Sequence, residues 1–425
     1  MSHRNYASYK KRKNRPERIT EKTGGKKMTK KELFVQGAEK YGTPLYIFDT
    51  DQAAEQVRSF RRILGKEIGL CYAMKANPFL VKQMAELTDR IEVCSMGEFY
   101  ICREKDIPAE KLFISGVLKK KEEIWQILDH SRGQCCCNVE SPGQFFAMAE
   151  WGEKNKKPVS LYLRLDSGSQ FGMDEKKIRS IIRTRDAWPY VKIRGIHYFS
   201  GTLKKAWKME KELKFLDGFL HEMEEDLGFH TKELEYGPGL SVPYFQGQED
   251  RTREDLEALS QAIKNMSWKG RVTLEMGRAF AASCGTYLTR VEDVKKNHEK
   301  NICIVDGGIH QLHYDGQIRG MYQPRIQVLE KAGGREKEWN VYGSLCTVHD
   351  LLIQNIPLRG LKKGSVLAFE NAGAYSHMEG MALFLSHELP GAVSYSREKG
   401  WKQIRREQQT YIWNMESEDN NGENN

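Results

Sequence analysis

The sequence predicts an α/β fold, a (β/α)8 TIM-like barrel followed by a mostly β C-terminal domain. Short apolar runs rich in branched and aromatic residues recur eight times before about residue 285, at intervals of 20 to 40 residues. Each interval has room for a strand, a turn and a helix, as in a barrel of about 250 residues. Beyond residue 285, strand-like runs follow one another with little helix between them. A chain of 425 residues is long enough for both domains.

The predicted barrel strands alternate with segments that have helical signals. Ser141 followed by Pro142 is typical of a helix start, and Asp174 precedes a segment with isoleucines on one helical face. A doubly wound open sheet is the alternative fold, but no G-x-G-x-x-G follows the first strand. The eight runs begin near residues 68 (IGLCYAM), 91 (IEVCS), 111 (KLFIS), 133 (GQCCCNV), 159 (VSLYLRL), 193 (IRGIHYF), 233 (ELEYG) and 271 (RVTLEM).

The second domain is predicted from the runs GTYLTRV, NICIVDG, VLAFENAGAY, GAVSYS and TYIWN. The run TPLYIFD, ahead of the barrel, has the same character, and we expect residues 40–50 to pair with the β domain. The predicted organisation is therefore a disordered basic tail at residues 1–30, the barrel at 40–285, the β domain at 286–414 and a disordered acidic tail at 415–425.

The net charge of +9 comes from the N-terminal tail. Residues 1–31 hold twelve Lys/Arg against two Asp/Glu, a net +10, so the remaining 394 residues carry −1. The body of the chain is not basic, and we expect no nucleic-acid partner. Met28, which precedes the foldable sequence, is an alternative natural start that would exclude most of this tail.

The composition also bounds the cellular setting. The sequence has no apolar run long enough to span a bilayer and no signal-peptide core, so we expect no membrane association. Nine cysteines without paired metal-ligand spacing indicate reduced thiols in a cytoplasm. Three of them are adjacent (135–137) and would alternate between the faces of a strand, which is poor zinc geometry, so no metal site is predicted.

Side chains able to bind a cofactor lie at the ends of three of the predicted strands, and a glycine-rich turn follows a fourth. In a barrel these ends meet at one mouth, where catalytic residues of the fold are found. An amine, a glycine-rich turn, a carboxylate and a guanidinium would therefore converge. They are Lys75 after strand one, His197 and Phe199 in strand six, Gly237 and Gly239 after strand seven, and Glu275, Gly277 and Arg278 after strand eight.

Seven motifs in the chain resemble those of the pyridoxal-phosphate-dependent diaminopimelate and ornithine decarboxylases, and they occur in the same order as in that family. They are YAMKANP, SMGE, GIHYFSGT, GPGL, EMGR, SLCTVHD and GAYS. The resemblance covers residues 40–414. It implies fold type III, an alanine-racemase-like barrel with a β domain, and amino-acid decarboxylation with pyridoxal 5′-phosphate as cofactor.

The resemblance assigns a role to each residue of the predicted mouth. Lys75 would hold the cofactor as a Schiff base. The backbone at Gly237 and Gly239 would cradle the phosphate, because glycine permits close approach to an anion. Arg278 would add positive charge near the phosphate or the substrate carboxylate, and Gly277 belongs to the same cofactor-binding element. Tyr375, in GAYS, would donate a hydroxyl to the phosphate.

Glu275 would face the pyridine nitrogen of the cofactor. A carboxylate there keeps the nitrogen protonated and makes the ring a strong electron sink. Racemases of this fold place an arginine at that nitrogen, so Glu275 favours decarboxylation over racemisation. A racemase, with Tyr375 or Tyr322 as the second base, is the alternative enzyme, and a non-catalytic regulatory relative is the alternative outside catalysis. The presence of Lys75 and Cys346 favours an enzyme.

Cys346 is the predicted proton donor to the substrate α-carbon. The family carries its catalytic cysteine at this place in the LC-x-x-x-D segment, and in the family this cysteine crosses from a partner subunit. The resemblance therefore implies a homodimer with shared active sites.

Three departures from the family pattern concern the substrate and the cofactor face. Phe199 stands where the relatives have a histidine stacked on the cofactor, while His197 is kept. Thr347 replaces the acidic residue that reads a distal amine, and the stretch 310–324, which includes Tyr322, lacks the expected R-P-x-x-Y element. A diaminopimelate-like substrate would imply lysine biosynthesis. Both elements that would bind the distal end of such a substrate therefore differ from the family pattern. The alternative substrate is an amino acid held on a carrier protein, or one used in specialised biosynthesis.

Overall fold

The structure is a computed structural model that describes residues 28–330 and 333–416. The predicted basic tail lies almost wholly outside the described residues, as does most of the predicted acidic tail.

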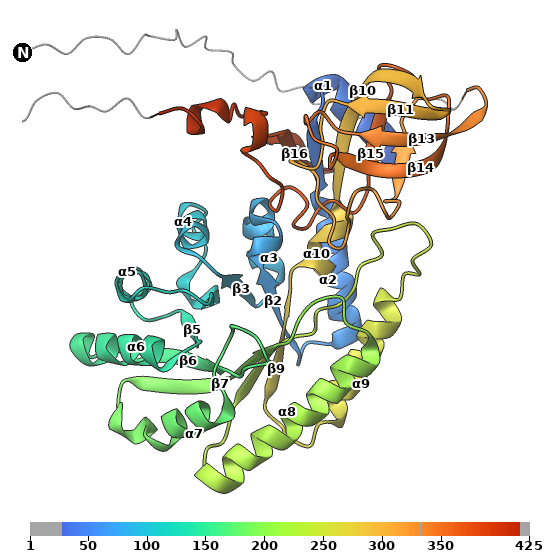
Figure 1. Ribbon diagram of the computed structural model, residues 1–425. Coiled ribbons are helices and arrows are strands. Elements are labelled where there is room, and N and C mark those ends of the chain that lie inside the picture. Colours follow the sequence, from blue (N-terminus) through green and yellow to red (C-terminus); the bar gives the residue numbers. More distant parts are fainter. Residues whose placement is uncertain (1–27, 331–332, 417–425) are drawn as a thin grey trace, which may run out of the picture.

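Eight parallel strands close into a barrel in sequential order, which confirms the predicted fold class (Figure 1). The last strand pairs with the first and places Cys71 opposite Glu275. This closure brings the carboxyl ends of all eight strands to one mouth. The strands are β2 (Gly69–Ala73), β3 (Arg90–Val93), β4 (Leu112–Ile114), β5 (Cys136–Val139), β6 (Val159–Arg164), β7 (Val191–Phe199), β8 (Glu233–Gly237) and β9 (Arg271–Met276).

Helices cover the outside of the barrel. The predicted helix starts are confirmed: Ser141 and Asp174 are N-caps whose side chains accept hydrogen bonds from backbone N–H groups of the first turn. The helices are α2 (Thr50–Leu64), α3 (Val81–Leu87), α4 (Met96–Glu104), α5 (Lys121–Ser131), α6 (Pro142–Asn155), α7 (Glu175–Arg183), α8 (Ala206–Leu227) and α9 (Thr252–Asn265). The short helix α10 (Arg278–Ala281) follows the last barrel strand, between the barrel and the β domain (Figure 1).

A nine-stranded mixed sheet forms the second domain, with the helix α1 (Lys30–Tyr41) packed on it. Strand β1, ahead of the barrel in the sequence, pairs antiparallel with β10 and parallel with β16, so the chain enters and leaves through this domain. The strands are β1 (Leu45–Asp49), β10 (Gly285–Asn297), β11 (Lys300–Val305), β12 (Ile326–Val328), β13 (Glu336–Tyr342), β14 (Leu351–Arg359), β15 (Val366–Phe369), β16 (Gly391–Ser396) and β17 (Gly400–Arg405).

One predicted strand is wrong. The TYIWN segment forms a 3-10 turn, Tyr411–Trp413, whose side chains are about half exposed. Its β-forming residue types predicted a strand, but propensity has little weight where a segment does not pack on a sheet.

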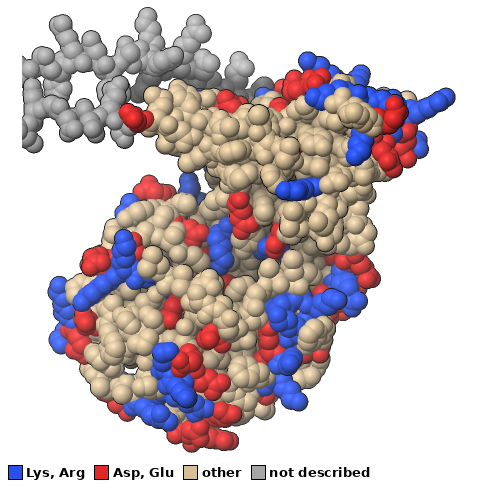
Figure 2. Space-filling model, in the orientation of Figure 1, with Lys and Arg blue, Asp and Glu red and all other residues tan. Residues whose placement is uncertain are grey.

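The surface agrees with a body of nearly balanced charge. On the face drawn in Figure 2, lysine and arginine side chains are interspersed with aspartate and glutamate over the barrel. Within residues 28–330 and 333–416, no helix is long and apolar enough to cross a membrane.

Candidate active site

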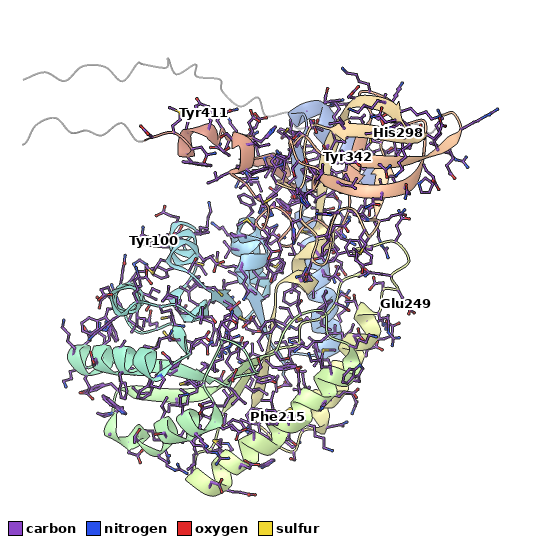
Figure 3. All side chains as sticks on the ribbon, in the orientation of Figure 1. Tyr100, Phe215, Glu249, His298, Tyr342 and Tyr411 are labelled. Atoms are coloured by element: carbon purple, nitrogen blue, oxygen red, sulfur yellow. The ribbon has the colours of Figure 1, made fainter. Side chains whose placement is uncertain are left out.

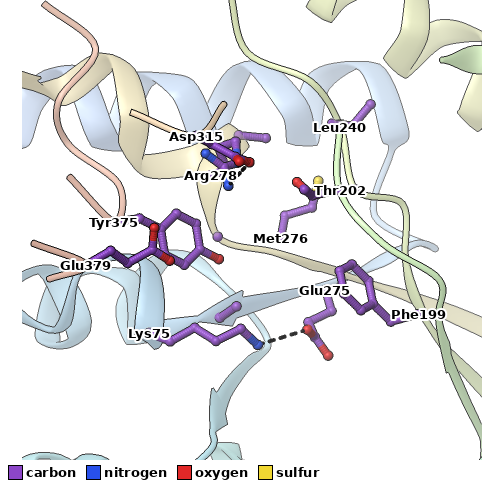
Figure 4. Close-up of a pocket in the computed structure, with 14 residues that line it drawn as sticks. Lys75, Phe199, Thr202, Leu240, Glu275, Met276, Arg278, Asp315, Tyr375 and Glu379 are labelled. Atoms are coloured by element: carbon purple, nitrogen blue, oxygen red, sulfur yellow. Dashed lines mark hydrogen bonds and ion pairs between the residues drawn. The ribbon is translucent and has the colours of Figure 1, made fainter. Parts of the chain in front are cut away.

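A cavity of about 330 Å³ lies at the C-terminal mouth of the barrel, beneath the β domain (Figure 4). Both domains contribute to its wall. Seven of the predicted site residues line it: Lys75, Phe199, Gly239, Glu275, Gly277, Arg278 and Tyr375. The arrangement that the strand ends predicted is therefore present in one chamber.

Lys75 lies in a 3-10 turn, Met74–Ala76, directly after β2. Its Nζ contacts the Glu92 carboxylate and lies 3.6 Å from Oε1 of Glu275 and 3.6 Å from Sγ of Cys94. Burial alone would lower the pKa of Lys75, but these neighbours outweigh it and hold the pKa above its usual value. Carboxylates on two strands thus fix the amine at the cavity.

Glu275 is 8 % exposed, and its second oxygen is buried. Oε2 lies 3.1 Å from Nε2 of His197, but no partner within the described residues satisfies hydrogen-bond geometry to this oxygen. His197 is neutral, because burial and then the charge of Arg164 lower its pKa to about 3. Its Nδ1 lies 2.8 Å from the Asn138 amide nitrogen. Glu275 lines the cavity, so a protonated ring nitrogen there could donate to its carboxylate.

The rings of strand β7 divide between the cavity and the core. Phe199 lines the cavity, whereas His197 is buried behind Glu275. A Cβ on Gly237 would lie 2.4 Å from the Phe199 ring, so the glycine leaves room for this ring beside the next strand. Phe199, rather than His197, is the aromatic surface presented to a bound molecule.

Two glycines allow the backbone to approach the cavity closely. Gly239 has φ +59°, and a Cβ there would lie 2.2 Å from the carbonyl oxygen of Gly201. A Cβ on Gly277 would lie 2.8 Å from that of Ala76. Thr202 lines the same region. This part of the wall, built from closely approaching backbone and a hydroxyl side chain, has the composition that an anion cradle needs.

Arg278 and Tyr375 form the wall between barrel and β domain. The guanidinium donates to the Tyr244 hydroxyl at 2.7 Å and to Asp315 Oδ2 at 2.9 Å, and lies 4.7 Å from the Tyr375 ring centroid. Burial raises the pKa of Tyr375 to about 12, so its hydroxyl remains a donor. The Tyr375 N–H donates to the Ala76 carbonyl at 2.8 Å, which fixes the β-domain segment beside Lys75.

Five predicted residues do not line the cavity of their own chain: His197, Gly237, Cys346, Thr347 and Tyr322. Cys346 and Thr347 lie in the β13–β14 loop, where Cys346 is exposed. Tyr322 is 49 % exposed and packs on the Phe245 ring.

Sequence reasoning missed five residues of the site. Glu92 and Cys94 lie in the run IEVCS, which was predicted as a strand, and Thr202 is part of GIHYFSGT. Attention to the ends of these strands could therefore have found all three residues. Asp315 and Glu379 also line the cavity, but they come from the β domain and no local pattern marks them.

A closed (β/α)8 barrel with an amine, a carboxylate and a glycine-built anion cradle at its mouth defines a fold type III pyridoxal-phosphate enzyme. Residues 45–373 match the family described as "Pyridoxal-dependent decarboxylase, C-terminal sheet domain", and the chain belongs to this family. It is a pyridoxal-phosphate-dependent amino-acid decarboxylase.

Named relatives agree with this assignment. The chain is 26 % identical to a diaminopimelate decarboxylase of Aquifex aeolicus, over 91 % of this chain and 95 % of the relative. It is 27 % identical to an L-glutamyl-[BtrI acyl-carrier protein] decarboxylase of Niallia circulans, over 87 % and 92 %. A crystal structure of diaminopimelate decarboxylase from M. jannaschii with L-lysine shares the fold, with a TM-score of 0.76 and 23 % identity over 88 % of this chain and 92 % of that one.

Proposed function

We propose that Lys75 holds the cofactor of this decarboxylase and that Glu275 faces its pyridine nitrogen. The single observation that supports both roles is that Nζ of Lys75 and the carboxylate of Glu275 face one cavity whose wall is a glycine cradle. When bound, pyridoxal phosphate supplies an aldehyde for an amino group and an electron sink for the pair left by a departing carboxylate.

The surrounding residues hold and orient the bound molecules. Thr202, the Gly239 backbone and the Tyr375 hydroxyl would bind the phosphate, while Phe199 covers one face of the ring. Arg278 adds positive charge that Asp315 partly offsets. Glu92, in contact with Nζ of Lys75, is placed to accept the proton that this ammonium must lose before it reacts with an aldehyde.

Borohydride trapping tests the assignment of Lys75. The holoprotein is reduced and digested, and the pyridoxyl label is located by peptide mapping. We expect the label on Lys75 and its loss in Lys75→Ala, with the exposed Lys82→Ala as the control. A label on another lysine would contradict the proposal.

The donor Cys346 would come from a second copy of the chain. Because Cys346 is exposed and does not line the cavity of its own chain, a homodimer with shared sites supplies it best. Figure 3 shows Tyr411 of the β domain and Tyr100 of the barrel on the same side of the molecule. Exposed apolar side chains of the kind that dimers bury occur on the β-domain segments: Met378, Met381, Leu383, Phe384, Leu385, Tyr411, Ile412, Trp413 and Met415.

The substrate would be an amino acid whose distal end is uncharged or masked, such as one carried on a protein. Thr347, next to Cys346, would enter the shared site with a hydroxyl in place of a carboxylate. An unpaired buried ammonium is strongly disfavoured, whereas a hydroxyl can donate to an amide, thioester or carboxylate. The relative from Niallia circulans, named for a carrier-bound glutamyl substrate, shows that such substrates occur among similar proteins.

A diamino acid is the second candidate, favoured by a specific observation. Glu379 lines the cavity, and its carboxylate lies 3.7 Å from Nε2 of His313. Asp315 also lines it, but it is paired with Arg278. Glu379 could therefore accept a distal ammonium.

The two substrate classes are separated by kcat/KM for glutamate, carrier-bound glutamate, ornithine and meso-diaminopimelate. If the distal end is masked, we expect diamino acids to be slower by about 10²–10³-fold, and Thr347→Glu to narrow that gap. If the wild type turns over diaminopimelate efficiently and Glu379→Gln lowers this turnover, the diamino acid is favoured instead.

All nine cysteines are free, which supports a reducing compartment, and we propose the cytoplasm.

A further inference from the structure

Lys204 is a buried lysine that the catalytic scheme does not use. It lies between β7 and α8, is 2 % exposed and does not line the cavity. Its Nζ donates to Glu212 Oε2 at 2.7 Å, to the Gly237 carbonyl at 3.0 Å and to Ser200 Oγ at 3.2 Å. These three acceptors use all the N–H groups of an ammonium. A lysine is seldom buried to this extent without a specific role.

The partner carboxylate is held as firmly as the amine. Glu212 is on α8, and it also accepts from the Tyr236 hydroxyl at 2.7 Å and from the Ser200 hydroxyl. Burial lowers the pKa of Lys204, and Glu212 opposes this effect, so the pair remains ionic only as long as both members are present.

Lys204 connects the two loops that form the anion cradle. Its backbone N–H donates to the Gly239 carbonyl at 2.8 Å, and its side chain donates to the carbonyl of Gly237, the last residue of β8. On the other side it follows Thr202 by two residues and binds Ser200. The glycine at 239 is also required by Lys204, because a Cβ there would lie 2.9 Å from Cε of the lysine.

This contact has an electrostatic consequence for an anion in the cavity. A carbonyl oxygen near a phosphate repels it, and the Gly237 and Gly239 oxygens are both occupied by Lys204 donors. With these acceptors engaged, the backbone N–H groups and the Thr202 hydroxyl would be the groups of the cradle that meet an anion. A single residue thus fixes the spacing of the two loops and occupies their acceptors.

We propose that Lys204 is a positioning residue for the phosphate monoester of the cofactor, acting through loops 199–202 and 237–240. This inference rests on the proposed function, because it requires the cofactor to lie in this cavity. Lys204 would set the affinity for the phosphate group and leave recognition of the pyridine ring to Glu275 and Phe199.

The test compares two ligands that differ only in the phosphate. Apoprotein is titrated with pyridoxal 5′-phosphate and with pyridoxal, using Lys204→Met and, as matched control, Lys205→Met, which removes the same charge from an exposed neighbour. We expect Lys204→Met to raise the dissociation constant for pyridoxal phosphate by about tenfold or more, and that for pyridoxal by less than about twofold. Lys205→Met should change neither.

The inference would be overturned if Lys204→Met weakened the binding of both ligands equally, or changed the binding of neither. If Lys204→Met does not fold, Ser200→Ala removes one contact of the ammonium while leaving the ion pair, and it should give a smaller loss confined to the phosphorylated ligand. An unchanged ratio of the dissociation constants for pyridoxal and pyridoxal phosphate in Ser200→Ala would then also overturn it. Borohydride labelling of the wild type separates the two failures: a label absent from Lys75 refutes the proposed function, whereas a label on Lys75 with an unaltered ratio refutes only the role of Lys204.

Discussion

At the residue scale, the site depends on side chains whose charge is fixed by a few neighbours. Glu275 illustrates this, since one oxygen faces Lys75 and the other faces His197 without a hydrogen bond. His197 is held neutral by burial, so it does not compensate the carboxylate. The negative charge of Glu275 is therefore available to a cation in the cavity.

Glu275→Gln should lower kcat by about 10²-fold or more while the protein keeps its cofactor. The amide has nearly the same shape but cannot hold a proton on a ring nitrogen, whereas the phosphate contacts lie elsewhere. The measurement combines steady-state turnover with cofactor content from absorbance. Unchanged turnover would show that Glu275 does not face the nitrogen.

A second residue-scale prediction concerns stability below neutral pH. His310 is 3 % exposed, neither ring nitrogen has a hydrogen-bond partner within residues 28–330 and 333–416, and burial lowers its pKa to about 4. An unfolded histidine titrates near 6.5, so between these values the unfolded state binds more protons. The contribution of His310 to stability is present above about pH 6.5 and is lost as pH falls towards 4.

His310→Phe should flatten this pH dependence. The free energy of unfolding of the wild type should fall relative to the variant by up to about 1.4 kcal/mol per pH unit between pH 6.5 and 4. Chemical denaturation at a series of pH values measures the difference, with the exposed His230→Gln as control. Parallel curves for wild type and His310→Phe would refute the assignment.

At the scale of elements, the β13–β14 loop that carries Cys346 is organised by one carboxylate. Asp350 is buried and accepts from the Ile309 N–H at 2.8 Å and the Leu345 N–H at 2.7 Å. A Cβ on Gly343 would lie 2.3 Å from this carboxylate, so the glycine leaves room for it. The C-x-x-x-D spacing thus has a structural cause: the aspartate holds the loop that presents the cysteine.

Asp350→Asn should misplace Cys346 without affecting the cofactor. One acceptor is replaced by a donor beside a backbone N–H, at a cost of about 1–3 kcal/mol in stability. We expect lower kcat, unchanged affinity for pyridoxal phosphate and slower alkylation or altered reactivity of Cys346. Gly343→Ala, which crowds the same carboxylate, should act in the same direction. Normal kcat in both variants would contradict this role of the loop.

At the scale of the whole molecule, the proposed homodimer predicts that each site takes Lys75 from one chain and Cys346 from the other. The cavity contains Lys75 and Glu275 but not Cys346 of the same chain. Mixing Lys75→Ala with Cys346→Ala, each nearly inactive alone, should restore about a quarter of wild-type activity after subunit exchange. Sedimentation confirms the dimer in each variant. No recovery despite demonstrated exchange would place both residues in one chain's site.

The sequence by itself predicted the barrel, its strands and half of the residues that line the cavity. The reason is local and geometric: apolar periodicity fixes the strands, and barrel closure brings their carboxyl ends together. Lys75, Phe199, Glu275 and Arg278 could therefore be assigned to one mouth before any contact was known. The helix starts at Ser141 and Asp174 could also be predicted, because a helix cap depends on residues adjacent in the sequence.

Only the tertiary structure decided which residues meet across long sequence separations. Asp315 and Glu379 reach the cavity because the β domain folds back over the barrel mouth, and TYIWN forms a turn because it does not pack on a sheet. Lys204 resembles a solvated lysine in the sequence TLKKAWK, yet it is buried against Gly237, 33 residues further along the chain. Such contacts depend on how distant elements pack, and local hydrophobic patterns do not encode that packing.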